Sequence, residues 1–285
     1  MDLARIWRLE KPEVSFTNLI VTTAFSLLEN PANLKLKGLK ESLIQLLVNV
    51  ERCSEIPVHS VLNILMKFDH LTSTIVGMIQ MITNENKNTS NFVNEIFREI
   101  GKIDNEEFAA DNNGAKLIGI FIEEISDKLP KVVMNYMSLL VPHLNVEFYP
   151  IRNAILTSIS RVLVEIKDEG EKKDQLFDIL LERLKDANAY TRSRDIQCWG
   201  YLCEHKSIPL SLLSQIVSGI VDRLQDKSAL VRKSAVQFLI TMLQYNPYGD
   251  VLEKAHFVEQ LESIKKKIKD HIKKVLKILK KVKEK

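Results

Sequence analysis

A motif that returns at a spacing of 40 residues restricts the fold of this chain more than any other feature. It consists of a leucine followed, eight residues later, by an arginine, and apolar side chains continue beyond the arginine at helical spacing. The three copies are Leu144 with Arg152, Leu184 with Arg192, and Leu224 with Arg232. Self-similarity at a fixed period of about 20–50 residues is typical of repeat proteins, in which one small unit stacks on copies of itself.

The turn before the arginine carries an aspartate in the second and third copies. Asp186 and Asp226 stand six residues before Arg192 and Arg232. A first helix, a tight turn with an aspartate and a second helix with an arginine near its start form the pattern of a HEAT repeat. An aspartate in each turn can accept hydrogen bonds from arginines of its own or an adjacent repeat. We therefore expect a structural ladder that consists of Arg152, Asp186, Arg192, Asp226 and Arg232.

Apolar side chains at three- and four-residue spacing occupy nearly the whole sequence and predict its fold class. This spacing is the period of an amphipathic helix, and short polar breaks separate the helical segments. The nine glycines and eight prolines are too few for the frequent turns of an all-β protein. We predict an all-α protein, an α-solenoid of about six or seven HEAT-type antiparallel helix pairs.

The domain organisation follows from the same pattern. The solenoid is expected over residues 1–250, with its clearest repeats at 131–167, 171–205 and 209–245. A basic amphipathic helix is expected over 251–285, because eleven lysines and only two acidic residues lie between Lys265 and Lys285. The rest of the chain has more acidic than basic side chains.

The role of this basic helix has three interpretations. It can pack on the solenoid or on a partner, bind nucleic-acid phosphates, or lie on a membrane surface. The phosphate-binding interpretation makes candidates of Lys265, Lys266, Lys267, Lys269, Lys273, Lys274 and Lys277.

Two further cations stand beside the repeat arginines. Because the repeat arginines lie in line, they could be a stripe for nucleic acid, but pairing with the turn aspartates and carbonyl groups is favoured. Arg194 and Lys233 fall just beyond the ladder position. Arg194 and Lys233 are therefore freer than the ladder arginines to contact DNA or a partner.

Signatures of catalysis and of cofactor binding are absent from the sequence. It has no glycine-rich phosphate loop, no nucleophile elbow and no His-Glu-x-x-His zinc motif. The nearest approach to a metal-ligand cluster is Cys198, Cys203 and His205, whose spacing does not suit a zinc site. We expect no enzymatic activity, no metal, no cofactor and no small-molecule substrate. No uncharged stretch reaches the length of a membrane span, so we also expect no membrane partner.

Four segments of the sequence resemble segments of one known family and stand in the same order as in that family. They are PHLNVEFYPIRNA (142–154), RSRDIQCWGYLCEHKSIPL (192–210), RLQDKSALVRKSAVQFL (223–239) and NPYG (246–249). On these residues the chain resembles the D2-type HEAT-repeat subunits of condensin I. Members of that family are several times longer and carry further HEAT repeats.

The resemblance implies a non-catalytic role in mitotic chromosome condensation. D2-type subunits bind the kleisin subunit, contact double-stranded DNA in chromatin together with it, and touch the ATPase heads of the SMC pair, where ATP is hydrolysed. It also implies a location in the nucleus and on chromosomes, with a cytoplasmic period in the cell cycle.

Two other functional classes remain open from the residues alone. One is a different HEAT adaptor, such as a nuclear transport receptor or a phosphatase scaffold. The other is a HEAT-like DNA glycosylase, which needs a carboxylate and a base-stacking aromatic side chain in a DNA cleft. Asp195 beside Trp199 is the only arrangement that suggests such a site.

Overall fold

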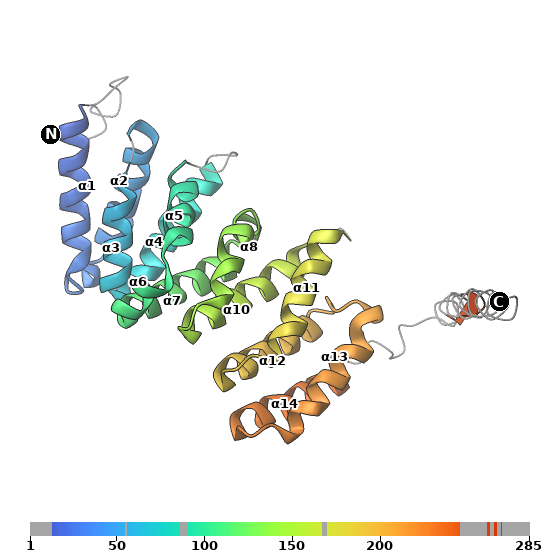
Figure 1. Ribbon diagram of the computed structural model, residues 1–285. Coiled ribbons are helices and arrows are strands. Elements are labelled where there is room, and N and C mark those ends of the chain that lie inside the picture. Colours follow the sequence, from blue (N-terminus) through green and yellow to red (C-terminus); the bar gives the residue numbers. More distant parts are fainter. Residues whose placement is uncertain are drawn as a thin grey trace, which may run out of the picture.

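The computed structural model has only helices as regular elements in the residues that it describes (Figure 1). Those residues are 13–54, 56–85, 91–166 and 170–245, together with 261–262, 265–266 and 269. The helices follow one another as antiparallel pairs in a single extended array, with α1 and α14 at its opposite ends (Figure 1). The predicted all-α solenoid is therefore confirmed.

The described residues form six pairs, and we name the first helix of each pair the A helix and the second the B helix. The first three pairs are α1 (Val14–Glu29) with α2 (Leu39–Cys53), α3 (Val58–Lys67) with α4 (Thr72–Glu85), and α5 (Asn91–Lys102) with α7 (Asn112–Lys128). The short helix α6 (Asn105–Ala110) lies between α5 and α7.

The last three pairs carry the repeated arginine motif. Their A helices are α8 (Pro130–Met134) continued by α9 (Met137–Leu140), α11 (Glu171–Arg183) and α13 (Leu210–Asp222). Their B helices are α10 (Tyr149–Glu165), α12 (Ala189–Glu204) and α14 (Ala229–Gln244). Four short 3-10 segments complete the described elements: η2 (Asn33–Lys35), η3 (Asp69–Leu71), η4 (Val141–Asn145) and η5 (Arg223–Gln225).

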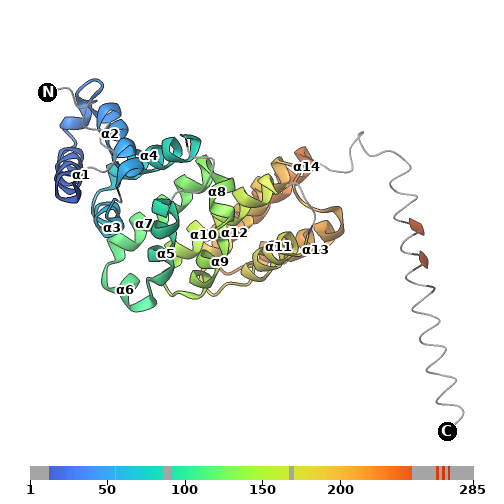
Figure 2. The same cartoon turned by 90° about the horizontal axis from the view of Figure 1, so that it is seen from above.

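Consecutive B helices pack directly against one another from α2 to α14, and Figure 2 shows α10 beside α12 within the array. Small side chains allow this approach between the later B helices. Ser126 Oγ of α7 lies 2.5 Å from Ser158 Oγ of α10, and Ser193 Oγ of α12 lies 2.8 Å from Ser234 Oγ of α14. The hydroxyl groups of these four buried serines are therefore all hydrogen-bonded.

The apolar core runs between the two helix layers and is shared by neighbouring pairs. Its largest fully buried side chains include Trp199, Phe97, Phe121 and Phe177. The Phe177 and Trp199 rings stack with centroids 5.9 Å apart and so join α11 to α12. Because one pair cannot bury its apolar face alone, the stability of each pair depends on its neighbours.

Side-chain caps fix several helix starts in the way that the sequence pattern suggests. Asp111 accepts a hydrogen bond from the Gly114 backbone N–H at 2.9 Å, and Asn188 accepts one from the Tyr190 backbone N–H at 2.8 Å. Such caps satisfy N–H groups that have no partner inside the helix. Among the described residues, no helix combines the length and apolarity that crossing a bilayer demands.

Substitution of Gly114, at the start of α7, tests the packing there, and substitution of Gly77, inside α4, is its control. We expect Gly114→Ala to lower the free energy of unfolding by about 1 kcal/mol or more, because its Cβ would lie 2.8 Å from Asp111 Cγ and 2.9 Å from Met66 Cε. Gly77→Ala in α4 is the matched control. Its Cβ meets no atom within 4 Å, so the gain in helix propensity should raise stability by about 0.5–1 kcal/mol. Urea unfolding followed by circular dichroism measures both changes, and equal effects of the two would contradict this account.

Candidate partner-binding surface

The arginine–aspartate ladder, made of Arg152, Asp186, Arg192, Asp226 and Arg232, joins the turns of neighbouring repeats. Arg152 begins the ladder from the first turn of α10. Its Nη1 donates to the carbonyl oxygens of Val146 and Glu147 in the preceding turn, at 2.6 and 3.2 Å. Its Nη2 donates to Asp186 Oδ1 of the next repeat at 3.1 Å.

Arg192 repeats this arrangement one unit later. Its Nη1 donates to the carbonyl oxygens of Asp186 and Ala187, at 2.8 and 3.0 Å. Its Nε and Nη2 both donate to the carboxylate of Asp226, each at 2.8 Å. Hydrogen bonds from the Arg192 guanidinium hold the pKa of Asp226 below its ordinary value, although burial acts in the opposite direction. A bidentate pair of this kind fixes both the distance and the orientation of the two repeats.

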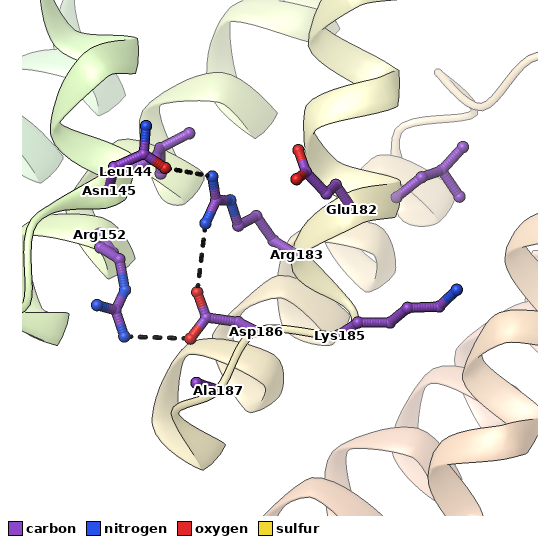
Figure 3. Close-up of a pocket in the computed structure, with 9 residues that line it drawn as sticks. Leu144, Asn145, Arg152, Glu182, Arg183, Lys185, Asp186 and Ala187 are labelled. Atoms are coloured by element: carbon purple, nitrogen blue, oxygen red, sulfur yellow. Dashed lines mark hydrogen bonds and ion pairs between the residues drawn. The ribbon is translucent and has the colours of Figure 1, made fainter.

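Each ladder aspartate also holds its own turn. Asp186 accepts a hydrogen bond from the Asn188 backbone N–H at 2.8 Å, and Asp226 accepts one from the Ser228 backbone N–H at 2.9 Å. Arg183 adds a second cation, with Nη1 3.6 Å from Asp186 Oδ2. Figure 3 shows Arg152 and Arg183 each approaching a different oxygen of Asp186, at the edge of a surface pocket of about 500 Å³. The charges of Arg152, Arg183 and Asp186 in this pocket are thus paired with one another.

Arg232 keeps only half of this arrangement. Its Nη1 donates to the carbonyl oxygens of Asp226 and Lys227, at 2.8 and 3.0 Å. No carboxylate among the described residues pairs with its guanidinium group. The side chain is exposed, because α14 is the last helix of the described array.

Half-buried and exposed side chains of α7, α10, α12 and α14 form a second surface, which we call the B-helix face. We define it by Glu123, Asp127, Thr157, Arg161, Arg194, Tyr201 and Lys233. Ion pairs and a ring contact link α7, α10 and α12 across it. Arg194 Nη2 lies 3.9 Å from Glu123 Oε1, and Arg161 Nε lies 3.1 Å from Asp127 Oδ1. The Arg161 guanidinium also stands 3.6 Å above the centre of the Tyr201 ring.

The two cations predicted for partner binding differ in their surroundings. Lys233 is exposed and pairs with no acidic group among the described residues. Arg194 is less free than expected, since Glu123 of α7 lies within ion-pair distance and 38% of its side chain is exposed. The charge of the B-helix face changes along the array, because α7 contributes Glu123 and Asp127 while α14 contains no acidic residue.

The candidate lysines of the basic C-terminal segment are described only in part. Lys265, Lys266 and Lys269 lie in helical conformation with exposed side chains. The other four, Lys267, Lys273, Lys274 and Lys277, lie outside the described residues, as does the expected boundary at residue 250.

The carboxylate and aromatic ring that suggested a glycosylase do not face a cleft. Asp195 and Trp199 are each completely buried, and the Trp199 ring stacks on Phe177 in the core. Burial raises the pKa of Asp195 well above its ordinary value, and the nearby charge of Asp186 adds to this effect. Neither oxygen of the Asp195 carboxyl group has a hydrogen-bond partner. A side chain in this position cannot reach a nucleobase, so the glycosylase interpretation loses its only candidate residues.

Cys198, Cys203 and His205, the nearest approach to a metal-ligand set in the sequence, differ in their surroundings. Cys198 and Cys203 are buried, and desolvation raises the pKa of Cys198 to about 12. His205 is exposed and its Nδ1 lies 2.8 Å from the Tyr201 carbonyl oxygen. In the part of the chain that the structure describes, no group of three or more such side chains could hold a metal ion.

The pairing of Arg161 with Tyr201 and Asp127 was not predicted from the sequence. A signal was present, because Arg161 and Tyr201 stand 40 residues apart, at the spacing of the repeat motif. Asp127 lies in α7, before the first clear copy of the motif, and only the packing of α7 on α10 brings it into contact.

Removal of one ladder carboxylate should destabilise the stack. We expect Asp226→Asn to lower the free energy of unfolding by about 2–3 kcal/mol at neutral pH, because it breaks a bidentate pair whose aspartate side chain is only 3% exposed. The pKa of Asp226 is lowered in the folded state, so its contribution is complete above the unfolded pKa and is lost as the pH falls through the folded pKa. The difference in the free energy of unfolding between the variant and the wild type should therefore shrink below about pH 4, as urea titrations at several pH values would show.

Exposed Asp222 of the same helix pair provides the control for this substitution. Asp222→Asn should change the free energy of unfolding by no more than about 0.5 kcal/mol. If it costs as much as Asp226→Asn, charge removal in general, and not the ladder, determines the effect.

The buried Asp195 should give the opposite dependence on pH. Since its pKa is raised in the folded state, the folded protein binds the proton more tightly, and stability falls as the pH rises above about 4. We expect Asp195→Asn to remove this loss, so that the variant gains on wild type by about 1.4 kcal/mol per pH unit until the folded pKa is reached. Urea unfolding at several pH values measures the gain, and exposed Asp174→Asn, which should give no such trend, is the control.

Comparison with known proteins places this array of helices in a family. The family model described as sister chromatid cohesion protein PDS5 matches residues 12–279. The condensin-1 complex subunit CAP-D2 of Arabidopsis thaliana is 33% identical over 275 residues, which cover 90% of this chain and 19% of that protein. Condensin complex subunit 1 of Xenopus laevis is 32% identical over 282 residues, which cover 95% of this chain and 21% of that protein. The chain thus spans about a fifth of the length of these curated relatives.

Among solved structures, a designed armadillo repeat protein in complex with the peptide (KR)4 aligns with a TM-score of 0.49 and 11% identity, over 85% of this chain and 99% of that one. The resemblance to D2-type condensin subunits, which the sequence segments predicted, is confirmed by the identities of the curated relatives. Because the family model extends over nearly all of the sequence, the chain belongs to the sister chromatid cohesion protein PDS5 family, and its similarity is to subunit 1 of condensin.

Proposed function

We propose that this chain is a non-catalytic portion of a condensin subunit that holds the kleisin subunit and duplex DNA. The relatives' names and the solenoid fold support this proposal, because a stack of helix pairs offers a long surface for an extended partner. Through the kleisin, the same portion would act on the SMC ATPase subunits. This role places the protein on chromosomes in the nucleus, with a cytoplasmic period in the cell cycle.

The B-helix face is the surface that we assign to these partners. The observation that carries the assignment is its continuity, because side chains of the three successive B helices α7, α10 and α12 contact one another across it. An extended peptide crossing the helices would meet Arg161 of α10 and Tyr201 of α12, which stand 40 residues apart in successive repeats. Arginine and tyrosine are enriched at the energetically dominant positions of protein interfaces.

DNA contact is assigned to the α12–α14 end of the B-helix face. There Arg194 and Lys233 are exposed at least in part, and α14 has no acidic residue to repel phosphate. The lysines of the C-terminal segment, including exposed Lys265, Lys266 and Lys269, would add to the same positive potential. The assignment predicts affinity without base specificity, since lysine and arginine contacts to phosphate carry no sequence information.

Charge reversal at two positions tests the DNA assignment. We expect Arg194→Glu combined with Lys233→Glu to weaken binding to a fluorescent duplex about tenfold near physiological salt. The slope of log affinity against log salt concentration should fall in magnitude by about two, one unit for each phosphate that the variant no longer neutralises. Fluorescence anisotropy at several salt concentrations measures both quantities.

The matched control reverses two exposed lysines on the A-helix side, with Lys172→Glu and Lys185→Glu. This pair makes the same change in net charge and should leave most of the affinity in place. If both double variants lose affinity equally, DNA responds to net charge alone and the assignment to the B-helix face is wrong.

Co-purification with the kleisin subunit of condensin tests the function as a whole. We expect the chain to retain the kleisin on a column with or without duplex DNA, and to retain neither a nuclear transport cargo nor a phosphatase catalytic subunit. Retention of the cargo or the phosphatase without the kleisin would replace this proposal by that of another HEAT adaptor.

A further inference from the structure

The last helix of the described array exposes an apolar face that its neighbour buries. Val236, Ile240 and Leu243 of α14 lie on adjacent turns and are 48%, 43% and 80% exposed. Ile196 and Cys203 stand 40 residues before Val236 and Leu243, and they are only 1% and 5% exposed. They are buried because α14 packs on α12. We call the uncovered surface formed by Val236, Ile240 and Leu243 the α14 end face.

Arg232 marks the same end of the array by its missing partner. Arg152 and Arg192 each pair with an aspartate that lies 34 residues later in the sequence. Arg232 binds its own turn as they do, yet none of the described residues offers it a carboxylate. The α14 end face therefore lacks both an apolar cover and an acidic group from a following unit.

The sequence beyond α14 repeats the pattern that supplies this acidic group in the preceding units. The pattern is a basic residue, an aliphatic residue, a polar residue and an aspartate. Its copies are RLKD at 183–186, RLQD at 223–226 and KIKD at 267–270. In the first two copies, the closing aspartate is the ladder member that the preceding repeat's arginine contacts.

The apolar residues before the aspartate also keep the same spacing. They stand two, six and nine residues before it, as Leu184, Leu180 and Phe177; as Leu224, Ile220 and Val217; and as Ile268, Ile264 and Leu261. In α11 and the turn after it, the three residues of the first set are at most 3% exposed, because they pack into the stack. Leu261, in contrast, is 52% exposed. An apolar segment without a cover thus stands in the same chain as an apolar face without a cover.

We propose that residues 257–285 dock on the α14 end face as one further unit of the stack. In this arrangement the carboxylate of Asp270, which stands 38 residues after Arg232 and not 34 as in the two earlier pairs, accepts hydrogen bonds from Nε and Nη2 of Arg232, as Asp226 does from Arg192. Leu261, Ile264 and Ile268 take the buried positions of an A helix beside α13. The apolar residues that follow Asp270 in the sequence, among them Val275 and Leu279, cover Val236, Ile240 and Leu243.

The length and the charge of the segment suit this position. Between Tyr245 and Leu261 the chain has sixteen steps, which extend to about 50 Å at roughly 3.3 Å per residue and so allow a return to α14. Lys265, Lys266 and Lys269 correspond in register to positions 181, 182 and 185, where Glu182 and Lys185 are exposed. Docking would therefore bury the apolar residues and leave most lysines in solvent.

Charge exchange between Arg232 and Asp270 tests this contact in the full chain. Hydrogen–deuterium exchange, read by mass spectrometry, reports protection in peptides from α14 and from residues 255–270. We expect Asp270→Arg to speed exchange in both regions at least fivefold, and Arg232→Asp to do the same. The double variant with both changes should recover most of the protection, because the pair is restored with its charges exchanged.

Glu262→Arg is the matched control, because it makes the same charge change in the same segment at an exposed position. It should leave the exchange of α14 close to that of the wild type. Equal exchange in the wild type and Asp270→Arg would overturn the proposal, as would a double variant that recovers nothing. Protection that rises with protein concentration would assign the α14 end face to a second copy of the chain and would also overturn it.

The outcome does not depend on the proposed function. Exchange reports the contact within the chain, whereas kleisin and DNA binding report the partners. A docked segment in a chain that binds neither partner would preserve this inference and refute the proposed function. A chain that binds the kleisin and DNA but has no docked segment would support the proposed function and refute this inference.

Discussion

The arginine–aspartate contact between consecutive turns is the constraint on which the register of the last three repeats depends. Apolar surfaces drive the helix pairs together, but such contacts have little direction and allow neighbouring layers to slide or rotate. The bidentate pair of Arg192 and Asp226 has one favourable geometry. Because the same arginine also binds its own turn through carbonyl oxygens, it ties the fold of one repeat to the position of the next.

The same arrangement explains how charged groups survive near the core. A buried ion pair is costly to desolvate and stabilises only when its remaining hydrogen-bonding capacity is satisfied. Asp226 meets this condition, with the Arg192 guanidinium on its oxygens and the Ser228 N–H as a further donor. Asp195 does not, since its carboxyl oxygens have no partner and its pKa is raised by burial. One aspartate therefore strengthens the stack at neutral pH, while the other weakens it.

The use of turns and small side chains for stacking leaves the exposed sides of the B helices available to other molecules. Hydroxyl pairs such as Ser193 with Ser234 bring neighbouring B helices together. Arg194, the residue after Ser193, instead reaches back to Glu123 of α7. The resulting face is a row of polar and aromatic groups with an acidic end at α7 and a basic end at α14. This polarity gives the proposed kleisin and DNA contacts different places on one surface.

The sequence by itself determined the fold class, the repeat unit and the identity of the ladder residues, because helical periodicity and a fixed motif spacing are local and repeated properties. It also carried the resemblance to condensin subunits, since segments such as DKSALVRKSA stand in one continuous stretch. Only the tertiary structure decided that Arg194 meets Glu123, that Arg161 lies between Asp127 and Tyr201, and that Asp195 and Trp199 are buried. Those facts depend on which faces of α7, α10 and α12 meet, and periodicity alone does not fix how far one helix turns against the next.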